Sequence, residues 1–156
     1  MAISRAKRFQ KKIRRKETNS TGGRGKFKRG FYNPINEGKY KLPQNNYMNS
    51  HPLPEYRSSW ELKMYKWMDM NTEVEYWSTE PFAIEYISPK DGQKHRYFPD
   101  VLMKLKDGRK YLIEIKPESQ HNDPINLAKW EQAEKFCKLH NLIWQVMGEK
   151  ELGIKK

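Results

Sequence analysis

Two runs of apolar residues near the middle of the chain have the pattern of adjacent β-strands. They cover residues 96–105 and 110–116, and both are rich in β-branched, aromatic and aliphatic side chains. The turn between them contains Asp107-Gly108, and Asp-Gly between two such runs favours a hairpin. A two-residue turn sets position 100 opposite position 115. The pattern therefore predicts an antiparallel hairpin at the centre of the fold.

Helical periodicity flanks this hairpin on both sides. One helix is predicted to begin near Ser58 and to carry a single apolar stripe. The stripe consists of Trp60, Met64, Trp67 and Met68. A second helix is predicted over residues 124–140, with Asp123 as its N-cap and Pro124 in the first helical position. Further strands are predicted over residues 74–77, 82–87 and 142–147. A strand–helix–strand unit of this length makes the last strand parallel to residues 110–116, so we expect an α/β fold with a mixed sheet flanked by helices.

Positive charge is concentrated at the N-terminus. The formal net charge is +12, and residues 1–30 contribute +11 of it, from twelve basic residues and one acid, Glu17. The basic residues are Arg5, Lys7, Arg8, Lys11, Lys12, Arg14, Arg15, Lys16, Arg24, Lys26, Lys28 and Arg29. A segment of this composition buries too little apolar surface to fold alone, so we expect an extended or disordered arm. Nucleic acid is its natural partner through phosphate neutralisation, and an acidic protein surface or anionic membrane is the alternative.

The composition divides the rest of the chain in two. Residues 31–57 are rich in Pro and Asn and predict a connector that lies across the domain surface or orders on a partner. Residues 58–150 are predicted to form the folded domain. The single cysteine, Cys137, cannot form an internal disulfide and is expected on the inner face of the second helix. No run approaches the roughly 20 apolar residues of a membrane span.

Charged groups of opposite sign converge at the ends of the hairpin strands. Glu114 and Lys116 are alternate residues of one strand and point to the same side, and Asp100 lies on the partner strand after Pro99. Two adjacent carboxylates repel each other unless a cation lies between them, and their hard oxygen atoms suit Mg²⁺ or Mn²⁺. A lysine beside such an ion orients or deprotonates a water molecule, or neutralises charge on a phosphate. The alternative is a surface hairpin with solvated charges.

Glu61 lies at the edge of the apolar stripe of the first helix, and two interpretations of it remain open. Ser58-x-x-Glu61 has the form of a capping box, in which Glu61 binds the backbone of its own helix. The same position also allows the carboxylate to reach inward, toward a site beside the hairpin.

The spacing of these residues resembles a known nuclease signature. Pro99-Asp100, thirteen intervening residues and then Glu114-Ile115-Lys116 are similar to the motif of the PD-(D/E)xK nuclease superfamily. The Ser-x-x-Glu helix resembles TnsA-type transposon-end endonucleases, and the chain as a whole is most similar to tailed-phage head-completion nucleases. The resemblance covers roughly residues 58–147 and implies a restriction-endonuclease-like core. It also implies that Asp100 and Glu114 bind the metal, that Glu61 is an additional metal ligand or an orienting group, and that Lys116 assists the attacking water as the last member of the catalytic set.

The resemblance implies a metal-dependent endonuclease that processes double-stranded DNA at the phage head–neck junction after packaging. The implied cofactor is Mg²⁺ or Mn²⁺, with no small-molecule cofactor. Portal or neck proteins would be its partners, and it would be found in the virion and, during assembly, in the host cytoplasm. A non-enzymatic neck protein that binds packaged DNA through the basic arm is the alternative. An RNA-binding module is a third possibility, but it needs aromatic residues exposed on a sheet, and the aromatic strands of this chain better suit a core.

Overall fold

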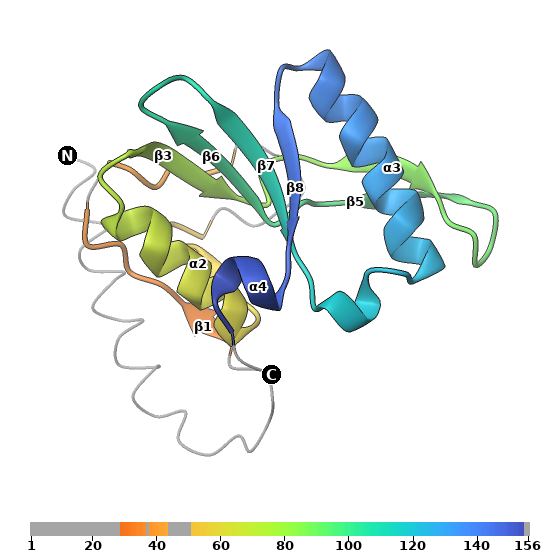
Figure 1. Cartoon of the computed structure of the whole chain (residues 1–156), viewed down its shortest axis with the longest axis horizontal. Coiled ribbons are helices and arrows are strands. Elements are labelled where there is room, and N and C mark those ends of the chain that lie inside the picture. The colour runs from red at the N-terminus through yellow and green to blue at the C-terminus, as the bar shows by residue number, and fades with distance from the viewer. Residues whose placement is uncertain (1–28, 37, 44–50, 155–156) are drawn as a thin grey trace.

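A four-stranded mixed sheet forms the centre of the computed structural model, which describes residues 29–36, 38–43 and 51–154 (Figure 1). In spatial order its strands are β3 (Val74–Thr79), β6 (Val101–Leu105), β7 (Lys110–Ile115) and β8 (Ile143–Met147). The pairs β3–β6 and β6–β7 are antiparallel, and β8 runs parallel to β7. The prediction of an α/β fold with a mixed sheet is confirmed. The predicted basic arm lies outside the described residues, except for Arg29 and Gly30.

Alternating side chains give the sheet two separate apolar faces. Along β7, Ile113 and Ile115 pack in a cluster with α2 (Ser59–Met70) and α4 (Glu149–Leu152). Leu112 points the other way, into a cluster with α3 (Pro124–Leu139). The single cysteine, Cys137, is buried in this second cluster, as predicted. The sheet is therefore covered by helices on both faces. Within the described residues, no helix has both the length and the apolar character needed to span a membrane.

Helix α2 begins as its sequence predicts but buries a different stripe. Ser58 is the N-cap, and its hydroxyl accepts a hydrogen bond from the Glu61 N–H at 3.1 Å. The predicted stripe is wrong at Trp67, which is 50% exposed. The residues of α2 that are buried instead are Met64, Tyr65, Met68 and Asp69. Tyr65 packs against the fully buried Trp77 of β3, and this contact turns the helix so that Trp67 faces outward.

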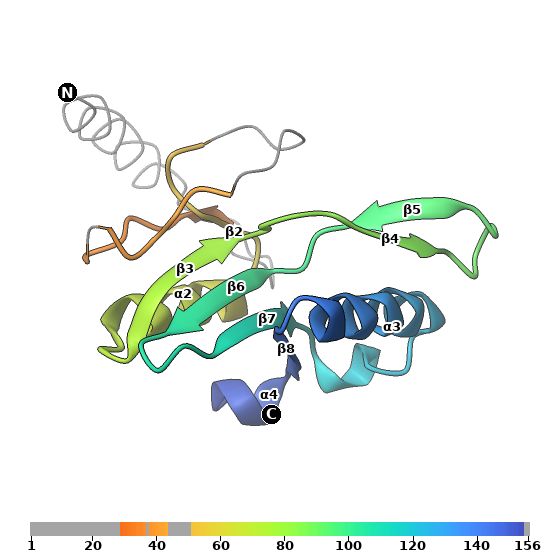
Figure 2. The ribbon, with the colours of Figure 1, turned by 90° about the horizontal axis from the view of Figure 1, so that it is seen from above.

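The predicted strand over residues 96–105 is two strands in two different sheets. β5 (Lys94–Tyr97) pairs with β4 (Ile84–Ile87), whereas β6 pairs with β3 and β7. The chain leaves the strand conformation around Pro99, which has no N–H to contribute to a ladder. Figure 2 shows the β4–β5 hairpin extending beyond the central sheet, on the same side as α3. The break at Pro99 leaves Asp100 between the two sheets.

The register of the β6–β7 hairpin differs by one residue from the prediction. The Leu105 N–H donates to the Arg109 carbonyl at 2.8 Å, and Gly108 has a φ of +100°. These features define a three-residue loop with glycine in the left-handed region, where the prediction assumed a two-residue turn. Val101 therefore pairs with Ile113, and continuing this register sets position 100 opposite Glu114.

Residues 29–36 and 38–43 pack against the domain, although they precede α2 in the sequence. β1 (Gly30–Phe31) pairs with β2 (Glu55–Tyr56), and Tyr40 forms a parallel bridge with Trp77 at the edge of the sheet. Tyr32 is buried in the same cluster as α2. The described residues of the Pro- and Asn-rich segment thus contribute side chains to the core.

Candidate active site

The adjoining ends of β6 and β7 bring Asp100 and Glu114 together. Asp100 is partly exposed, and its Oδ2 accepts a hydrogen bond from the Ile115 N–H at 2.7 Å. This bond fixes the Asp100 carboxylate against β7, at the residue that directly follows Glu114. The sequence-predicted pair of carboxylates thus lies at one place in the structure.

Glu114 is a buried acid with an unsatisfied oxygen. Its side chain faces the same side of β7 as Leu112, and the residue is only 7% exposed. Oε2 is buried and has no hydrogen-bond partner among the described residues. Burial raises the pKa of the Glu114 carboxyl well above its ordinary value, and the negative charge of Asp100 raises it further. A buried carboxylate without partners is costly, so this oxygen is available for a ligand.

The pKa of the Asp100 carboxyl is also raised above its ordinary value. Burial and then the negative charge of Glu61 raise its pKa from 3.8 to about 7. The hydrogen bond from Ile115 and the positive charge of Lys116 act in the opposite direction, and Glu80 adds a further increase. The two carboxylates are therefore difficult to ionise together in the absence of a cation.

Lys116 is the cation of this group, and its backbone is fixed on both sides. Its N–H donates to the Met147 carbonyl at 3.0 Å, and its carbonyl oxygen lies 2.8 Å from Nε2 of His121. The positive charge of Lys116 lowers the pKa values of three carboxyl groups. These groups belong to Asp100, Glu114 and Glu61.

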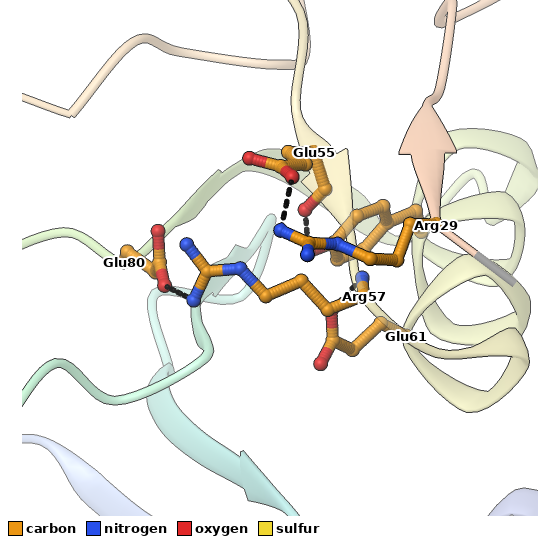
Figure 3. A network of polar contacts seen from close by, with 6 residues as sticks. Arg29, Glu55, Arg57, Glu61 and Glu80 are labelled. Atoms are coloured by element: carbon orange, nitrogen blue, oxygen red, sulfur yellow. Dashed lines mark hydrogen bonds and ion pairs between the residues drawn. The ribbon is translucent and has the colours of Figure 1, made fainter. Parts of the chain in front are cut away.

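Glu61 combines features of both sequence interpretations. Its Oε2 accepts a hydrogen bond from the Arg57 N–H at 2.7 Å, one residue before the N-cap, so the carboxylate is held at the start of α2 (Figure 3). Burial raises the pKa of the Glu61 carboxyl, and the negative charge of Glu61 in turn raises the pKa of Asp100. The side chain thus serves the helix terminus and also contributes charge to the site.

Three further charged residues at the site were missed by sequence reasoning. Glu80 directly follows β3, and its N–H donates to the Asp100 carbonyl at 3.0 Å. Arg57 pairs with Glu80, with 3.1 Å between Nη1 and Oε1. Lys129 of α3 lies 5.7 Å from the ring centroids of both Tyr86 and Tyr97, and its charge lowers the pKa of Glu114. Their only sequence signal is charge, which they share with many surface residues.

The donor set suits a hard divalent cation. Asp100 and Glu114 both offer carboxylate oxygens, which are the ligands that such a cation prefers. A cation between them would stabilise their ionised forms, whose pKa values are raised, and would give the buried Oε2 of Glu114 a partner. Within the described residues, no group of three or more His, Cys, Asp or Glu side chains is arranged to hold an ion. The carboxylate of Glu61, bound to Arg57, is therefore not a third ligand in this conformation.

The fold and this pair of carboxylates define a restriction-endonuclease-like domain. Residues 71–149 match the family described as "TnsA-like endonuclease N terminal", and the chain belongs to this family. The matching segment contains Asp100, Glu114 and Lys116 and begins after Glu61.

Among curated proteins, the chain is similar to the head completion nuclease of Enterobacteria phage T4. The two are 35% identical over 96 residues, which is 61% of this chain and 64% of the phage T4 protein. The matched region thus spans just under two thirds of that relative.

The predicted nucleic-acid contacts of the basic arm fall almost entirely on residues that the structure does not describe. Arg29 alone among the twelve lies within the described ranges. It forms an exposed ion pair with Glu55, with 3.2 Å between Nη2 and Oε1 (Figure 3).

Proposed function

We propose that this chain is a metal-dependent DNA endonuclease of the phage head-completion type. The observation that carries the proposal is the juxtaposition of Asp100 and Glu114 beside Lys116 at the ends of β6 and β7. Family membership supports the reaction class, and similarity to the phage T4 head completion nuclease supports the setting.

In this proposal Asp100 and Glu114 hold Mg²⁺ or Mn²⁺, with Glu61 as an additional ligand or orienting group. The ion would polarise the scissile phosphate and lower the pKa of a bound water molecule. Movement of Glu61 away from the Arg57 N–H would let its carboxylate take the ligand role. The buried oxygen of Glu114 needs no such movement, because it has no other partner among the described residues.

Lys116 acts on the reacting phosphate. In this proposal its ammonium group orients the attacking water and neutralises charge that develops on the phosphate oxygens, and its influence on the pKa values of all three carboxyl groups supports this role. The water oxygen bonds to phosphorus and releases one proton to solvent, the bond from phosphorus to one sugar oxygen breaks, and that oxygen takes up a proton from solvent. The backbone contacts of Lys116 to Met147 and His121 fix the main chain from which this side chain extends.

The proposed substrate is double-stranded DNA at the head–neck junction after packaging. Portal or neck proteins are the proposed partners, and the virion and the host cytoplasm the proposed locations. The cationic residues 1–30 would bind phosphates along the same DNA.

A cleavage assay tests the reaction. Linear and circular double-stranded DNA are incubated with the protein and with Mg²⁺, Mn²⁺ or a chelator. We expect cleavage that requires the metal and is lost in Asp100→Ala. The matched control is Glu85→Ala, which removes an exposed carboxylate of β4 that pairs with Lys94 at 3.5 Å, away from the site. DNA binding without cleavage in any metal would favour the non-enzymatic neck protein instead.

The arm requires a separate test. Deleting residues 1–30 removes +11 of the +12 formal charge but none of the proposed active site. We expect DNA affinity to fall and its salt dependence to flatten by several units, since each phosphate contact contributes about −0.9 to the slope of log affinity against log salt. An unchanged slope, measured by fluorescence anisotropy, would show that the folded domain holds the DNA.

A further inference from the structure

Arg57 lies at the edge of the active site and has two separate contacts there. Its backbone N–H binds the Glu61 carboxylate at 2.7 Å, and its guanidinium reaches away from α2 to Glu80 (Figure 3). The positive charge of Arg57 lowers the pKa values of both Glu61 and Glu80. Substituting the side chain would remove the second contact and leave the first, because the N–H belongs to the backbone.

The partner of this guanidinium is itself tied to the site. Glu80 has a φ of +45°, which is uncommon for a residue other than glycine, and its N–H donates to the Asp100 carbonyl. Its negative charge raises the pKa values of Asp100 and Glu61. The guanidinium of Arg57 therefore lies beside the acidic groups proposed to meet the scissile phosphate.

The Arg57–Glu80 ion pair is partly exposed to solvent. The side chains are 50% and 27% exposed, and ion pairs that water reaches contribute little to the stability of a protein. Two oxygens of a phosphate can accept a pair of hydrogen bonds from one guanidinium, as the two oxygens of a carboxylate can. Little stability is therefore lost when the Arg57 guanidinium leaves Glu80 to bind a DNA phosphate.

We propose that Arg57 is a phosphate-contacting residue of the active site, which rests on Glu80 in the free protein and moves to a DNA phosphate when substrate binds. This inference rests on the proposed function, because it assumes that DNA enters the site beside Asp100. The exchange takes the Arg57 guanidinium away from Glu80, whose negative charge then faces the same acidic groups without this ion pair.

Arg57→Gln tests the contact, and Arg109→Gln is the matched control. Arg109 also forms an exposed ion pair, with Asp107 at 2.8 Å, but it lies at the turn of the hairpin, at the far end of the strands from Asp100. Binding to a duplex oligonucleotide is measured by anisotropy at several salt concentrations, without divalent metal, in an Asp100→Ala background that cannot cleave. We expect Arg57→Gln to reduce the salt slope by about 0.9, and Arg109→Gln to leave it unchanged. In the cleaving protein, Arg57→Gln should lower kcat/KM by about 10- to 100-fold with an unchanged Tm.

A double-mutant cycle tests the exchange itself. Glu80→Gln should strengthen DNA binding a few-fold by releasing Arg57, and this gain should disappear when Arg57→Gln is also present. A gain of the same size in both backgrounds would mean that Glu80 only repels DNA, and the exchange would be overturned. If Arg57→Gln lowers the Tm, Arg57→Lys is used in its place to test the phosphate contact. Lysine keeps the positive charge but cannot bind in bidentate fashion, so the salt slope must stay at the wild-type value while the affinity falls.

These readouts separate the two hypotheses. A wild-type protein that binds DNA without cleaving it rejects the nuclease proposal, yet the salt slope still reports on Arg57. Cleavage with an Arg57→Gln slope equal to that of Arg109→Gln overturns only the role of Arg57.

Discussion

Two buried acids of this protein have opposite surroundings. Asp69, at the end of α2, is fully buried and accepts hydrogen bonds from three donors. The donors are the Tyr32 hydroxyl, the Ile35 N–H at 2.7 Å and the Asn36 N–H at 3.0 Å. Glu114 is almost as deeply buried, but one of its oxygens has no partner among the described residues. Both positions carry the cost of burying a carboxylate, and hydrogen bonds offset that cost only at Asp69.

We propose that this difference separates a structural acid, Asp69, from a functional one, Glu114. The bonds to Asp69 fasten residues 32–36 to α2, and Lys39 adds hydrogen bonds to the Asp69 and Asn71 carbonyls at 2.9 and 2.7 Å. Segments far apart in the sequence are joined there, and both carboxylate oxygens of Asp69 are already hydrogen-bonded. At Glu114 an unsatisfied oxygen lies beside a second carboxylate, an arrangement that costs stability and that we propose serves to bind a cation.

The largest effect is expected for Glu114→Gln, the direct test of the functional acid. Glutamine has nearly the same shape but no charge, so it removes the proposed metal ligand and also the cost of burying an ionised group. We expect DNA cleavage to fall by about 10³-fold or more, equivalent to about 4 kcal/mol, while the Tm of the metal-free protein stays the same or rises. A Tm well below that of the wild type would place Glu114 with Asp69 as a structural acid.

Asp69→Ala should give the reverse result. It leaves the buried Tyr32 hydroxyl and two backbone N–H groups without their acceptor, so we expect a loss of about 3 kcal/mol in the free energy of unfolding. Urea denaturation measures this loss, and Asp107→Ala at the exposed hairpin turn is the control. Cleavage per folded molecule at low temperature should remain close to that of the wild type. Wild-type stability would contradict the structural role.

Local signals in the sequence predicted much of the fold. Ser58 and Asp123 are the N-caps that their residue types indicate, and the apolar runs on either side of Asp107-Gly108 form the predicted hairpin. The convergence of Asp100 and Glu114 also follows from this hairpin. The one-residue register was not predictable, because Asp-Gly occurs in both two- and three-residue loops.

Contacts between segments that are distant in the sequence could not be predicted from local sequence patterns. Asp69 is buried because residues 32–36 supply its hydrogen-bond donors. The helical periodicity, which predicted that Trp67 faces the core, does not indicate that Asp69 is buried. Glu80 and Arg57 meet across 23 positions, through the fold alone. The strand break at Pro99 had a local signal, since proline cannot donate to a ladder, but its consequence, two separate sheets, depends on β4.

The pH dependence of stability sharpens the comparison for Asp100. Its pKa is about 7 in the folded protein against an ordinary value of 3.8, so between about pH 4 and 7 the folded state retains a proton that the unfolded state has lost. This group therefore favours folding at low pH, and its contribution is lost as the pH rises through 7. We expect the metal-free wild type to lose about 2 kcal/mol more stability between pH 5 and pH 8 than Asp100→Asn does. Denaturant titrations at pH 5 and pH 8 measure the free energy of unfolding of both proteins. Equal losses in the wild type and in Asp100→Asn would contradict a raised pKa for Asp100.

Glu61 stands between the two kinds of acid, and the smallest expected change in stability is at this position. Its carboxylate has a backbone partner, the Arg57 N–H, as a structural acid does, yet its charge raises the pKa of Asp100, as a member of the site does. Glu61→Gln keeps an oxygen that accepts the Arg57 bond and removes the charge, so the free energy of unfolding should change by less than about 0.5 kcal/mol. If the charge serves the metal, cleavage falls about 10-fold or more and recovers partly at higher metal concentration. Glu61→Ala, which also loses the cap, is the comparison, with about 1 kcal/mol of lost stability. Wild-type cleavage by Glu61→Gln together with destabilisation by Glu61→Ala would assign Glu61 to the helix terminus alone, and the site would then rest on Asp100 and Glu114.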